Sequence, residues 1–176
     1  MNTNSNLVWY VTYGSNLYED RFLVYIKGGK KYNDRKIDPC ADITPPRKSI
    51  RYDLPYSMFY AHHSPSWKDH PVSFLDISEP GFAYGRAYLI TKEQFKHVRK
   101  WEGKGTDWYC DKIYLGEIES YPAFTLTCSQ ANPIFMLKNR QHFEDTDPRY
   151  QEVLIKGMQE TVPELTLEEI LDYLKK

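Results

Sequence analysis

The chain has 176 residues, of which 41% are hydrophobic and 15% are aromatic, and its formal net charge is −1. A chain of this length and composition can bury one substantial core, so we predict a single domain over residues 1–176. Its apolar runs are far shorter than the ~20 residues of a membrane-spanning helix, and residues 1–6 do not resemble the start of a signal peptide. We therefore expect a soluble, cytoplasmic protein without a membrane partner.

The cysteines and the basic residues argue against two further classes of protein. Cys40, Cys110 and Cys128 are odd in number and widely spaced, which fits neither a disulfide framework nor a paired zinc site. Residues 27–36 contain a cluster of lysines and arginines, but the sequence pI is about 6.5 and no nucleic-acid-binding module is recognisable. We expect reduced thiols, a solvated basic loop and no nucleic-acid partner.

The first predicted elements are a strand and a helix. Residues 7–11, Leu-Val-Trp-Tyr-Val, are typical of a buried strand. The stretch that follows ends at Gly28, and a glycine is common just after a helix. Its apolar residues have the spacing of one helical face: Tyr18, Phe22, Tyr25 and Ile26.

The turn between this strand and this helix is the most informative segment of the chain. Its sequence is Tyr13-Gly14-Ser15-Asn16, and if Asn16 caps the helix, Glu19 completes a capping box. The backbone N–H groups of residues 14–17 would then point outward from the positive end of a helix. Such an arrangement binds a small anion, either a carboxylate or a phosphate.

The middle of the chain is predicted to be rich in strands. Residues 32–56 have no sustained periodicity and contain four prolines, which is typical of a functional loop and makes them a candidate lid. Strands are predicted at residues 56–60, 72–75, 82–90, 108–115 and 123–128. The last two are predicted to be joined by a hairpin at residues 116–120.

Capping signals open three further helices, at Thr91, at Asp147-Pro148 and at Thr166. The first is predicted to end at Gly103. The second has one apolar face: Tyr150, Val153, Leu154, Gly157 and Met158. The third is predicted to turn four residues inward: Leu167, Ile170, Leu171 and Leu174. Strands in the middle and helices near both ends predict an α+β fold, with a small mixed β-barrel or curved sheet flanked by helices.

Glu102 occupies an unusual place for a carboxylate. It follows Phe95 by seven residues and Val98 by four, so it lies on the apolar face and at the C-terminal end of its helix. Burial and the negative helix end both disfavour an anion, so we expect a raised pKa, as suits a general acid or base. The alternative is a frayed helix end at which Glu102 turns to solvent and pairs with Lys104 or Arg99.

Taken together, these motifs resemble the gamma-glutamylcyclotransferase-like family. Tyr13-Gly14-Ser15-Asn16-Leu17 matches the family's loop after the first strand, and Trp101-Glu102-Gly103 matches its Glu-Gly helix end. Tyr109 matches a tyrosine on the next strand. Pro148-Arg149-Tyr150 and Gly157 match a motif of the C-terminal helix. The motifs occur in the family's order over most of the chain.

The resemblance implies a reaction in which the α-amine of a γ-glutamyl group attacks its own γ-carbonyl, leaving 5-oxoproline and a free amine. Glu102 would be the general acid and base, because the attacking amine must lose a proton and the departing amine must gain one. Binding of the small-molecule γ-glutamyl substrate would fall to Tyr13, Gly14, Ser15, Asn16, Leu17, Tyr109 and Tyr150. The reaction requires no metal and no organic cofactor.

The chain also departs from the family's pattern. Residues 32–56 are longer and richer in proline than we expect from the smaller members, and residues 67–70, Trp-Lys-Asp-His, stand where several relatives have a tryptophan followed by glycines. Both segments can set the identity of the leaving amine, which stays open. The alternative function is a non-catalytic binding or regulatory module that recognises an amino-acid-like ligand or a protein partner.

Three other patterns carry less weight. Four residues are close enough in sequence to suggest a metal site, namely His62, His63, Asp69 and His70, but adjacent histidines in a strand point to opposite faces. A calcium-loop pattern is absent around the acidic residues Glu144, Asp145 and Asp147. Ser15 lies on a strand-to-helix turn like a nucleophile elbow, but no glycine stands two residues before or after it and no His/Asp partner is identifiable. We expect no metal site.

Overall fold

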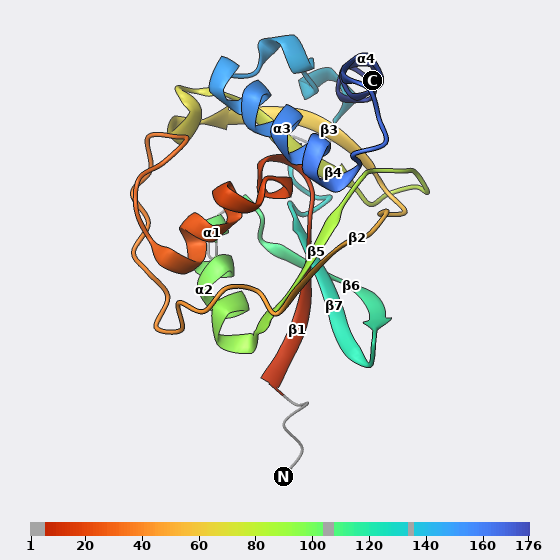
Figure 1. Ribbon diagram of the computed structural model, residues 1–176. Helices are drawn as coiled ribbons and strands as arrows, with labels where there is room; N and C mark the ends of the chain where they lie inside the picture. Colours follow the sequence, from red (N-terminus) through yellow and green to blue (C-terminus); the bar gives the residue numbers. More distant parts are fainter. Residues whose placement is uncertain (1–5, 104–107, 134–135) are drawn as a thin grey trace.

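The computed structural model describes residues 6–103, 108–133 and 136–176 and has an α+β fold (Figure 1). Its larger sheet has the strand order β2 (Lys48–Arg51), β5 (Arg86–Thr91), β1 (Leu7–Thr12), β7 (Tyr121–Thr127), β6 (Asp111–Ile118). A second sheet contains β3 (Ser57–Ser64) and β4 (His70–Asp76). Within the described residues the larger sheet stays open, so the curved sheet is confirmed and a closed barrel is not formed.

Four α-helices lie in the described residues: α1 (Glu19–Lys27), α2 (Lys92–Glu102), α3 (Pro148–Thr161) and α4 (Leu167–Leu174). Short 3-10 segments include η2 (Gly14–Leu17), η3 (Pro65–Trp67), η5 (Leu137–Asn139) and η6 (Phe143–Asp145). Figure 1 shows α1 and α2 next to each other beside the larger sheet, and α3 near β3 and β4.

The central strand of the larger sheet is β1, and every one of its residues is buried. It pairs antiparallel with β5 and parallel with β7. Side chains alternate along the strand, so Val8 and Tyr10 pack with residues of α1 and α2, whereas Trp9 belongs to the core on the other face. The chain therefore leaves a rigid, buried strand directly before it enters η2.

The helix α3 approaches η2 closely because residue 157 is a glycine. A Cβ atom built on Gly157 would lie 2.6 Å from Cβ of Leu17 and 2.6 Å from the backbone nitrogen of Tyr18. Any larger residue would push α3 away from η2. The sequence placed Gly157 on the buried face of this helix, and that prediction is confirmed.

Most predicted helix signals are confirmed. These are the capping boxes at Thr91 and Thr166, the cap at Asp147 before Pro148, and the helix ends at Gly28 and Gly103. In α4, Ile170 and Leu174 are buried as predicted. The inward position predicted for Leu167 is wrong, because this first residue of α4 lies on its outer side and is 53% exposed.

The predicted helix cap at Asn16 is also wrong. The chain first forms η2, and α1 begins at Glu19 with Tyr18 at the cap position and no side-chain capping bond. The amide of Asn16 instead donates to Glu102, 86 residues away in sequence. Glu19 does not complete a capping box, because its carboxylate pairs with Arg86 at 2.5 Å. Contacts with residues distant in sequence, Glu102 and Arg86, therefore replace the two capping bonds that were predicted within the helix start.

Several strand boundaries differ from the predictions. Residues 32–56 include an edge strand, β2, whose four residues are all exposed and therefore carry no alternating pattern. The strands predicted from residues 82 and 108 begin at Arg86 and Asp111. The hairpin turn is narrower than predicted: Glu119 and Ser120 both have positive φ, and β6 continues past a register shift up to Ile118.

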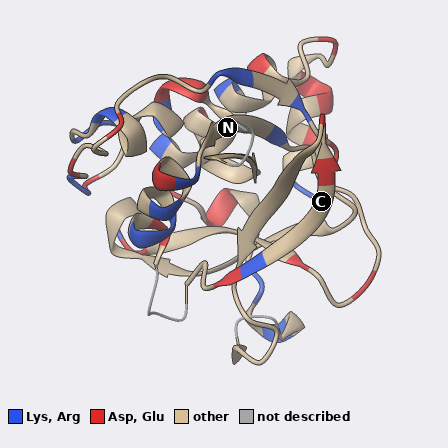
Figure 2. Cartoon of the chain, turned by 90° about the horizontal axis from the view of Figure 1, so that it is seen from below, with Lys and Arg blue, Asp and Glu red and all other residues tan. Residues whose placement is uncertain are grey.

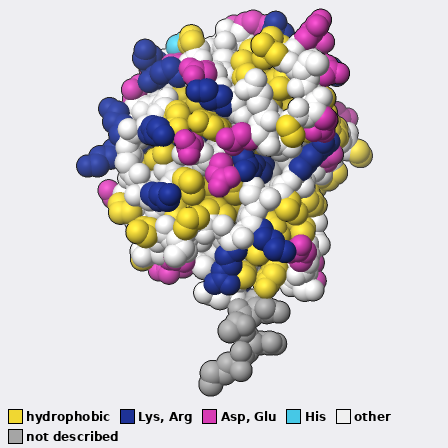
Figure 3. Space-filling view, in the orientation of Figure 1, with side chains coloured by type: hydrophobic (Ala, Val, Ile, Leu, Met, Phe, Trp, Pro, Cys, Tyr) yellow, Lys and Arg dark blue, Asp and Glu magenta, His cyan; other side chains and the backbone are white. Residues whose placement is uncertain are grey.

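The surface carries charges of both signs. Figure 2 shows basic and acidic residues on most outer elements, and Figure 3 shows them interspersed with hydrophobic side chains on one face. The helices of the described regions are too short or too polar to cross a membrane.

Candidate functional site

Glu102 is the last residue of α2 and turns toward the loop that follows β1. The helix is anchored by the capping box of Thr91 and Gln94, and it buries Phe95 and Val98 against the sheet. Because Glu102 shares their face, its side chain points into the molecule. The amide nitrogen Nδ2 of Asn16 donates to its Oε1 at 2.7 Å.

The surroundings of Glu102 favour its protonated form. Burial raises the pKa of the carboxyl, and it outweighs the lowering by the charge of Arg21 and by side-chain hydrogen bonds from Asn16 and Tyr25. Among the ion pairs of the described residues, none involves Glu102. The direction of the pKa shift is therefore the one expected from the sequence. The alternative pairing with Arg99 does not occur, and the other partner considered, Lys104, lies outside the described residues.

The loop opposite Glu102 is held in a conformation that requires Gly14. The residue has φ of 69°, and a Cβ there would lie 2.0 Å from Oγ of Ser73. Carbonyl oxygens of the loop are fixed from the other side, since the hydroxyl of Tyr88 donates to the carbonyl of Asn16 at 3.0 Å. Arg86 donates to the carbonyl of Leu17 at 3.1 Å.

Of the four backbone N–H groups predicted to bind an anion, at residues 14–17, only two remain free to do so in η2. A 3-10 helix uses the N–H groups of its later residues in bonds to the residue three positions before. In η2 the N–H groups that lack such an intrahelical acceptor are those of Gly14 and Ser15. The side chain of Leu17 packs in the core with Tyr150 and Leu154, so its part is structural.

Asn16 has one polar atom that remains unpaired. Its Nδ2 bonds to Glu102, but its Oδ1 is buried and accepts no hydrogen bond from the described residues. A buried, unpaired acceptor is unfavourable unless a ligand or a water supplies a donor. The loop therefore offers a hydrogen-bond acceptor directly beside the carboxylate of Glu102.

The three predicted tyrosines surround the same place, but their hydroxyl groups already have partners. Tyr13 donates to the carbonyl of Leu126 at 2.7 Å, and Tyr109 donates to the carbonyl of Ser73 at 2.7 Å. The hydroxyl of Tyr150 accepts from the backbone nitrogen of Ser73 at 3.0 Å and bonds to its Oγ at 2.7 Å. Burial raises the pKa of Tyr150 to about 12, so it stays protonated at neutral pH.

Two hollows share Glu102 in their lining. The inner pocket has a volume of about 30 Å³, and the outer cavity has a volume of about 360 Å³. Both are lined by Ser15, Glu102, Tyr109 and Tyr150. A water needs about 10–15 Å³ by this measure, so the inner pocket accepts only a small group such as a carboxylate.

The outer cavity is bordered by the end of β3 and by η3. Residues 63–67 line it, together with Asn33 and Arg35 from the predicted lid segment. Both segments in which the chain departs from the family's pattern therefore reach the cavity: Trp67 of the 67–70 turn and residues 33 and 35 of the 32–56 segment.

Four residues of the site were missed by the sequence analysis: Arg21, Tyr25, Arg35 and Ser73. Arg21 and Tyr25 are one helical turn apart, so a charged residue on the apolar face was a usable signal. Ser73 is a polar residue inside the apolar strand β4 and gave a similar, weaker signal. Arg35 lies in an irregular loop, and its position could not be read from a pattern.

The histidines and the aspartate of residues 62–70 do not come together as a set of metal ligands. His63 bonds through Nδ1 to the carbonyl of Asp69 at 2.6 Å, and His70 bonds to the carbonyl of Trp67 at 3.0 Å. The ring of His62 stacks on Trp108. No group of three or more metal-ligating side chains occurs in the described parts of the chain.

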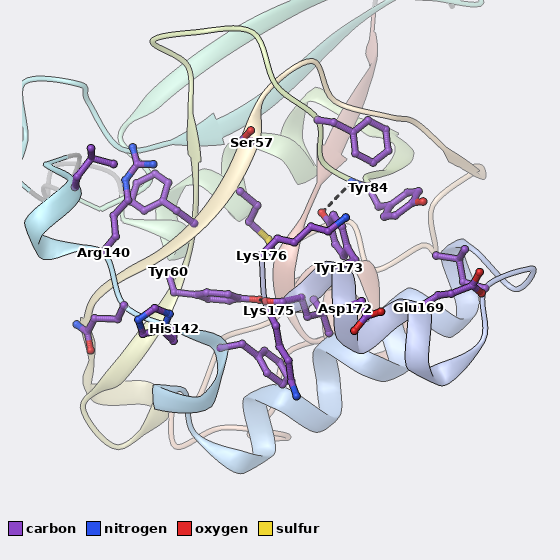
Figure 4. Close-up of a pocket in the computed structure, with 18 residues that line it drawn as sticks. Ser57, Tyr60, Tyr84, Arg140, His142, Glu169, Asp172, Tyr173, Lys175 and Lys176 are labelled. Carbon is purple, nitrogen blue, oxygen red and sulfur yellow. Dashed lines mark hydrogen bonds between the residues drawn. The ribbon is translucent and has the colours of Figure 1, made fainter.

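A larger hollow, of about 940 Å³, lies on a different part of the molecule, next to β3 and α4 (Figure 4). Its polar groups serve the fold: the hydroxyl of Tyr60 donates to the carbonyl of Leu174, and Tyr173 accepts from the backbone of Tyr84. The carboxylate of Glu169 is held in the capping box of α4. This hollow lacks a desolvated acid such as Glu102, so we place the candidate site at Glu102.

Similarity to known proteins is clearest at the level of the fold. No family model matches the chain. Histone deacetylase 5 from Arabidopsis thaliana is 26% identical over 206 residues; the match covers 96% of this chain, which thus spans only 30% of the length of that curated relative. Two solved structures are similar, each with a TM-score of 0.60. One is a gamma-glutamyl cyclotransferase, 13% identical, with 95% of this chain and 86% of that chain covered. The other is an uncharacterised protein from Homo sapiens, 14% identical, with 96% and 87% covered. The chain therefore has the gamma-glutamylcyclotransferase-like fold, as its sequence motifs led us to expect.

Proposed function

We propose that the protein is a γ-glutamylcyclotransferase-type enzyme that converts a γ-glutamyl amide or peptide into 5-oxoproline and a free amine. The observation that carries the proposal is the partly buried carboxylate of Glu102, which has a raised pKa and lines both the inner pocket and the outer cavity. A carboxyl shifted in this direction is suited to exchange protons near neutral pH. The shared fold adds support, although a fold alone does not determine a reaction.

The acceptors around Glu102 fit an amine. Its carboxylate, the unpaired Oδ1 of Asn16 and the hydroxyl oxygen of Tyr109 all line the inner pocket. Because Tyr109 uses its proton on the carbonyl of Ser73, its oxygen offers lone pairs to a donor. A substrate ammonium has three N–H donors, and this set of oxygens can receive them.

The substrate carboxylate would bind on the side of the loop. Ser15 lines the inner pocket and can donate from its N–H and its hydroxyl, and the N–H of the preceding residue, Gly14, also lacks an acceptor within η2. Placing the α-carboxylate there leaves the α-amine next to Glu102. With the α-carboxylate in the inner pocket and the α-amine beside Glu102, the glutamyl chain would have to fold back in the outer cavity, which brings the amine and the γ-carbonyl close together.

The proposed reaction balances with one proton carrier. Glu102 takes a proton from the α-ammonium, and the amine nitrogen forms a bond to the γ-carbonyl carbon. As the bond from that carbon to the leaving nitrogen breaks, Glu102 gives its proton to the leaving nitrogen. The ring nitrogen still carries one proton too many, and the freed carboxylate of Glu102 takes this second proton and passes it to the leaving amine, which departs as an ammonium. No other residue has to change its protonation state, and the ring of 5-oxoproline is complete.

The test is turnover of a panel of γ-glutamyl amino acids, peptides and amines, with 5-oxoproline detected by mass spectrometry. We expect product with at least one panel member and a loss of about 10²–10⁴-fold in rate for Glu102→Gln, the usual contribution of a general acid or base. Glu93→Gln, a change of the same type at an exposed position on the same helix, should leave the rate unchanged.

Two results would contradict the proposal. Equal turnover by Glu102→Gln and the wild type would remove Glu102 from the mechanism. Binding of γ-glutamyl compounds without any turnover would favour the alternative, a non-catalytic module that recognises an amino-acid-like ligand.

A further inference from the structure

Tyr88 is a buried tyrosine whose hydroxyl bonds to the loop of the candidate site, although the proposed reaction does not use it. It belongs to β5, is fully buried, and its ring stacks on that of Phe22 with 4.1 Å between the ring centroids. The hydroxyl donates to the carbonyl of Asn16 at 3.0 Å, and the same oxygen lies 3.4 Å from the carbonyl oxygen of Leu17. Burial raises the pKa of Tyr88, so its hydroxyl keeps the proton and acts as a donor.

The carbonyl groups that Tyr88 contacts have no donor within η2. Asn16 and Leu17 are the last residues of this 3-10 segment, and the final carbonyls of a helix lack an intrahelical partner. Arg86, two residues before Tyr88 on β5, donates to the carbonyl of Leu17 at 3.1 Å. The hydroxyl of Thr12 lies 3.3 Å from the carbonyl of Asn16, but its single proton has a shorter bond, of 3.0 Å, to the carbonyl of Arg86. Tyr88 is therefore the main donor to the carbonyl of Asn16.

One continuous segment of the chain holds Asn16 from two sides. The backbone carbonyl of Asn16 accepts from Tyr88 on β5, whereas its side-chain amide donates to Glu102 at the end of α2, the helix that directly follows β5. The bond to Glu102 has a length of 2.7 Å and depends on where the backbone of residue 16 lies. Without the hydroxyl of Tyr88 the peptide group after Asn16 would be free to rotate, and the side-chain amide would then leave its place beside Glu102.

The other groups that act on Glu102 are not hydrogen-bonded to Tyr88 in the described parts of the chain. The hydrogen-bonded route from Tyr88 to Glu102 therefore runs through Asn16. The titratable and charged groups around Glu102 come from several elements and are Tyr10, Tyr13, Arg21, Tyr25, Arg35, Tyr109 and Tyr150.

We propose that Tyr88 is a positioning residue of the candidate site, whose hydroxyl fixes the carbonyl of Asn16 so that the side-chain amide stays bonded to Glu102. This inference rests on the proposed function for the part that Glu102 plays in the reaction. Tyr88 acts only through Asn16, because within the described residues it lines neither the inner pocket nor the outer cavity. Burial raises the pKa of Glu102, and the bond from Asn16 lowers it. Losing that bond leaves less of Glu102 able to accept a proton at a given pH.

The test removes one hydroxyl and measures the pKa of Glu102 by carbon-detected NMR, which needs no turnover. Tyr88→Phe keeps the ring that stacks on Phe22. We expect it to raise the pKa of Glu102, in the same direction as Asn16→Ala. Combined with Asn16→Ala, Tyr88→Phe should give no further shift, because the amide through which it acts is already absent.

Turnover and a matched control complete the test. Tyr88→Phe should lower kcat/KM for the release of 5-oxoproline by about 3- to 10-fold, the equivalent of one hydrogen bond, and by less than about twofold when Asn16→Ala is already present. Tyr60→Phe removes another buried hydroxyl that donates to a carbonyl, that of Leu174 at 3.1 Å. This control should leave both kcat/KM and the pKa of Glu102 unchanged.

An unchanged pKa of Glu102 in folded Tyr88→Phe would overturn the inference, and so would a full further shift in the double variant. A Tyr88→Phe protein that does not fold would show that the hydroxyl serves the fold and would also overturn it. If no γ-glutamyl compound is turned over, the proposed function fails, while the NMR titration still decides whether Tyr88 holds Asn16 against Glu102.

Discussion

Glu102 and Asp147 are both carboxylates withdrawn from solvent, and each lies at the end of a helix. Asp147 caps the N-terminus of α3, where the helix dipole favours an anion, and Glu102 ends α2, where the dipole disfavours one. Asp147 accepts from the backbone nitrogen of Arg149 at 2.7 Å and pairs with its guanidinium at 3.0 Å. Burial raises the pKa of Asp147, but these bonds outweigh it and the net pKa is lowered.

The difference between the two carboxylates separates the structural role of Asp147 from the reactive role that we propose for Glu102. The positive charge of Arg21 lowers the pKa of Glu102, but the two side chains form no ion pair. The effect of burial is larger, so the net pKa of Glu102 is raised. Asp147 keeps its charge and stabilises a helix start. Glu102 is left able to take up and release a proton, which is what the proposed reaction requires.

The largest expected effect is on activity. Glu102→Gln should lower kcat/KM by about 10²–10⁴-fold, whereas Asp147→Ala should change the activity of the folded protein by less than about fivefold, the equivalent of ~1 kcal/mol. Steady-state release of 5-oxoproline measures both, at a temperature where circular dichroism shows each variant folded. A similar loss of kcat/KM in both variants would contradict the different roles assigned to Glu102 and Asp147.

Stability should show the reverse order. Asp147→Ala should lower the free energy of unfolding at pH 7 by about 1–2 kcal/mol, because it removes the helix cap and one partner of Arg149. Glu102→Gln should leave stability the same or slightly higher, because it replaces a disfavoured anion by a neutral group. Urea unfolding with unchanged m-values checks both. A larger loss in Glu102→Gln would mean that its carboxylate serves the fold.

The two carboxylates should also differ in how stability depends on pH. For Glu102 the folded pKa lies above the ordinary value of 4.5, so its contribution is complete below that pH and is lost as pH rises through the folded pKa. The stability of Glu102→Gln relative to the wild type should therefore increase as pH rises above about 4.5. Asp147 has a folded pKa below 3.8, so the penalty of Asp147→Ala should be full at neutral pH and shrink in acid. Parallel curves for the two variants would contradict the opposite shifts.

A smaller change sharpens the account of Glu102. Asn16→Ala removes the bond from Nδ2 to Oε1 and should raise the pKa of Glu102 further, because this bond lowers the pKa of the carboxyl in the wild type. The acid limb of the pH–rate profile should move to higher pH. Asn139→Ala, at a residue whose side-chain amide bonds to the carbonyl of Pro133 in an exposed segment, should leave the profile in place.

The parts of the site that depend on local sequence were predictable. The spacing of Phe95, Val98 and Glu102 placed the carboxylate on the inner face of α2, and the capping box at Thr91 fixed where that helix begins. The glycine of the loop was recognisable from its motif, although the need for it, the contact with Ser73, was not.

The parts that depend on tertiary contacts were not predictable. Local propensity favoured Asn16 as a helix cap, but its amide serves Glu102 from another helix. Ser73 joins the two tyrosines only because the separate sheet of β3 and β4 packs against the loop. The exposed strand β2 has no alternation to detect. In each case the partner lies far away in the sequence.

Carbon-detected NMR titration of the side-chain carboxyl groups tests the central claim most directly, because it observes Glu102 and Asp147 in the same sample. The account predicts a pKa above 4.5 for Glu102 that disappears from the spectrum of Glu102→Gln, and a pKa below 3.8 for Asp147. It also predicts that the acid limb of the wild-type pH–rate profile follows the value measured for Glu102. A pKa for Glu102 at or below 4.5 would contradict the account.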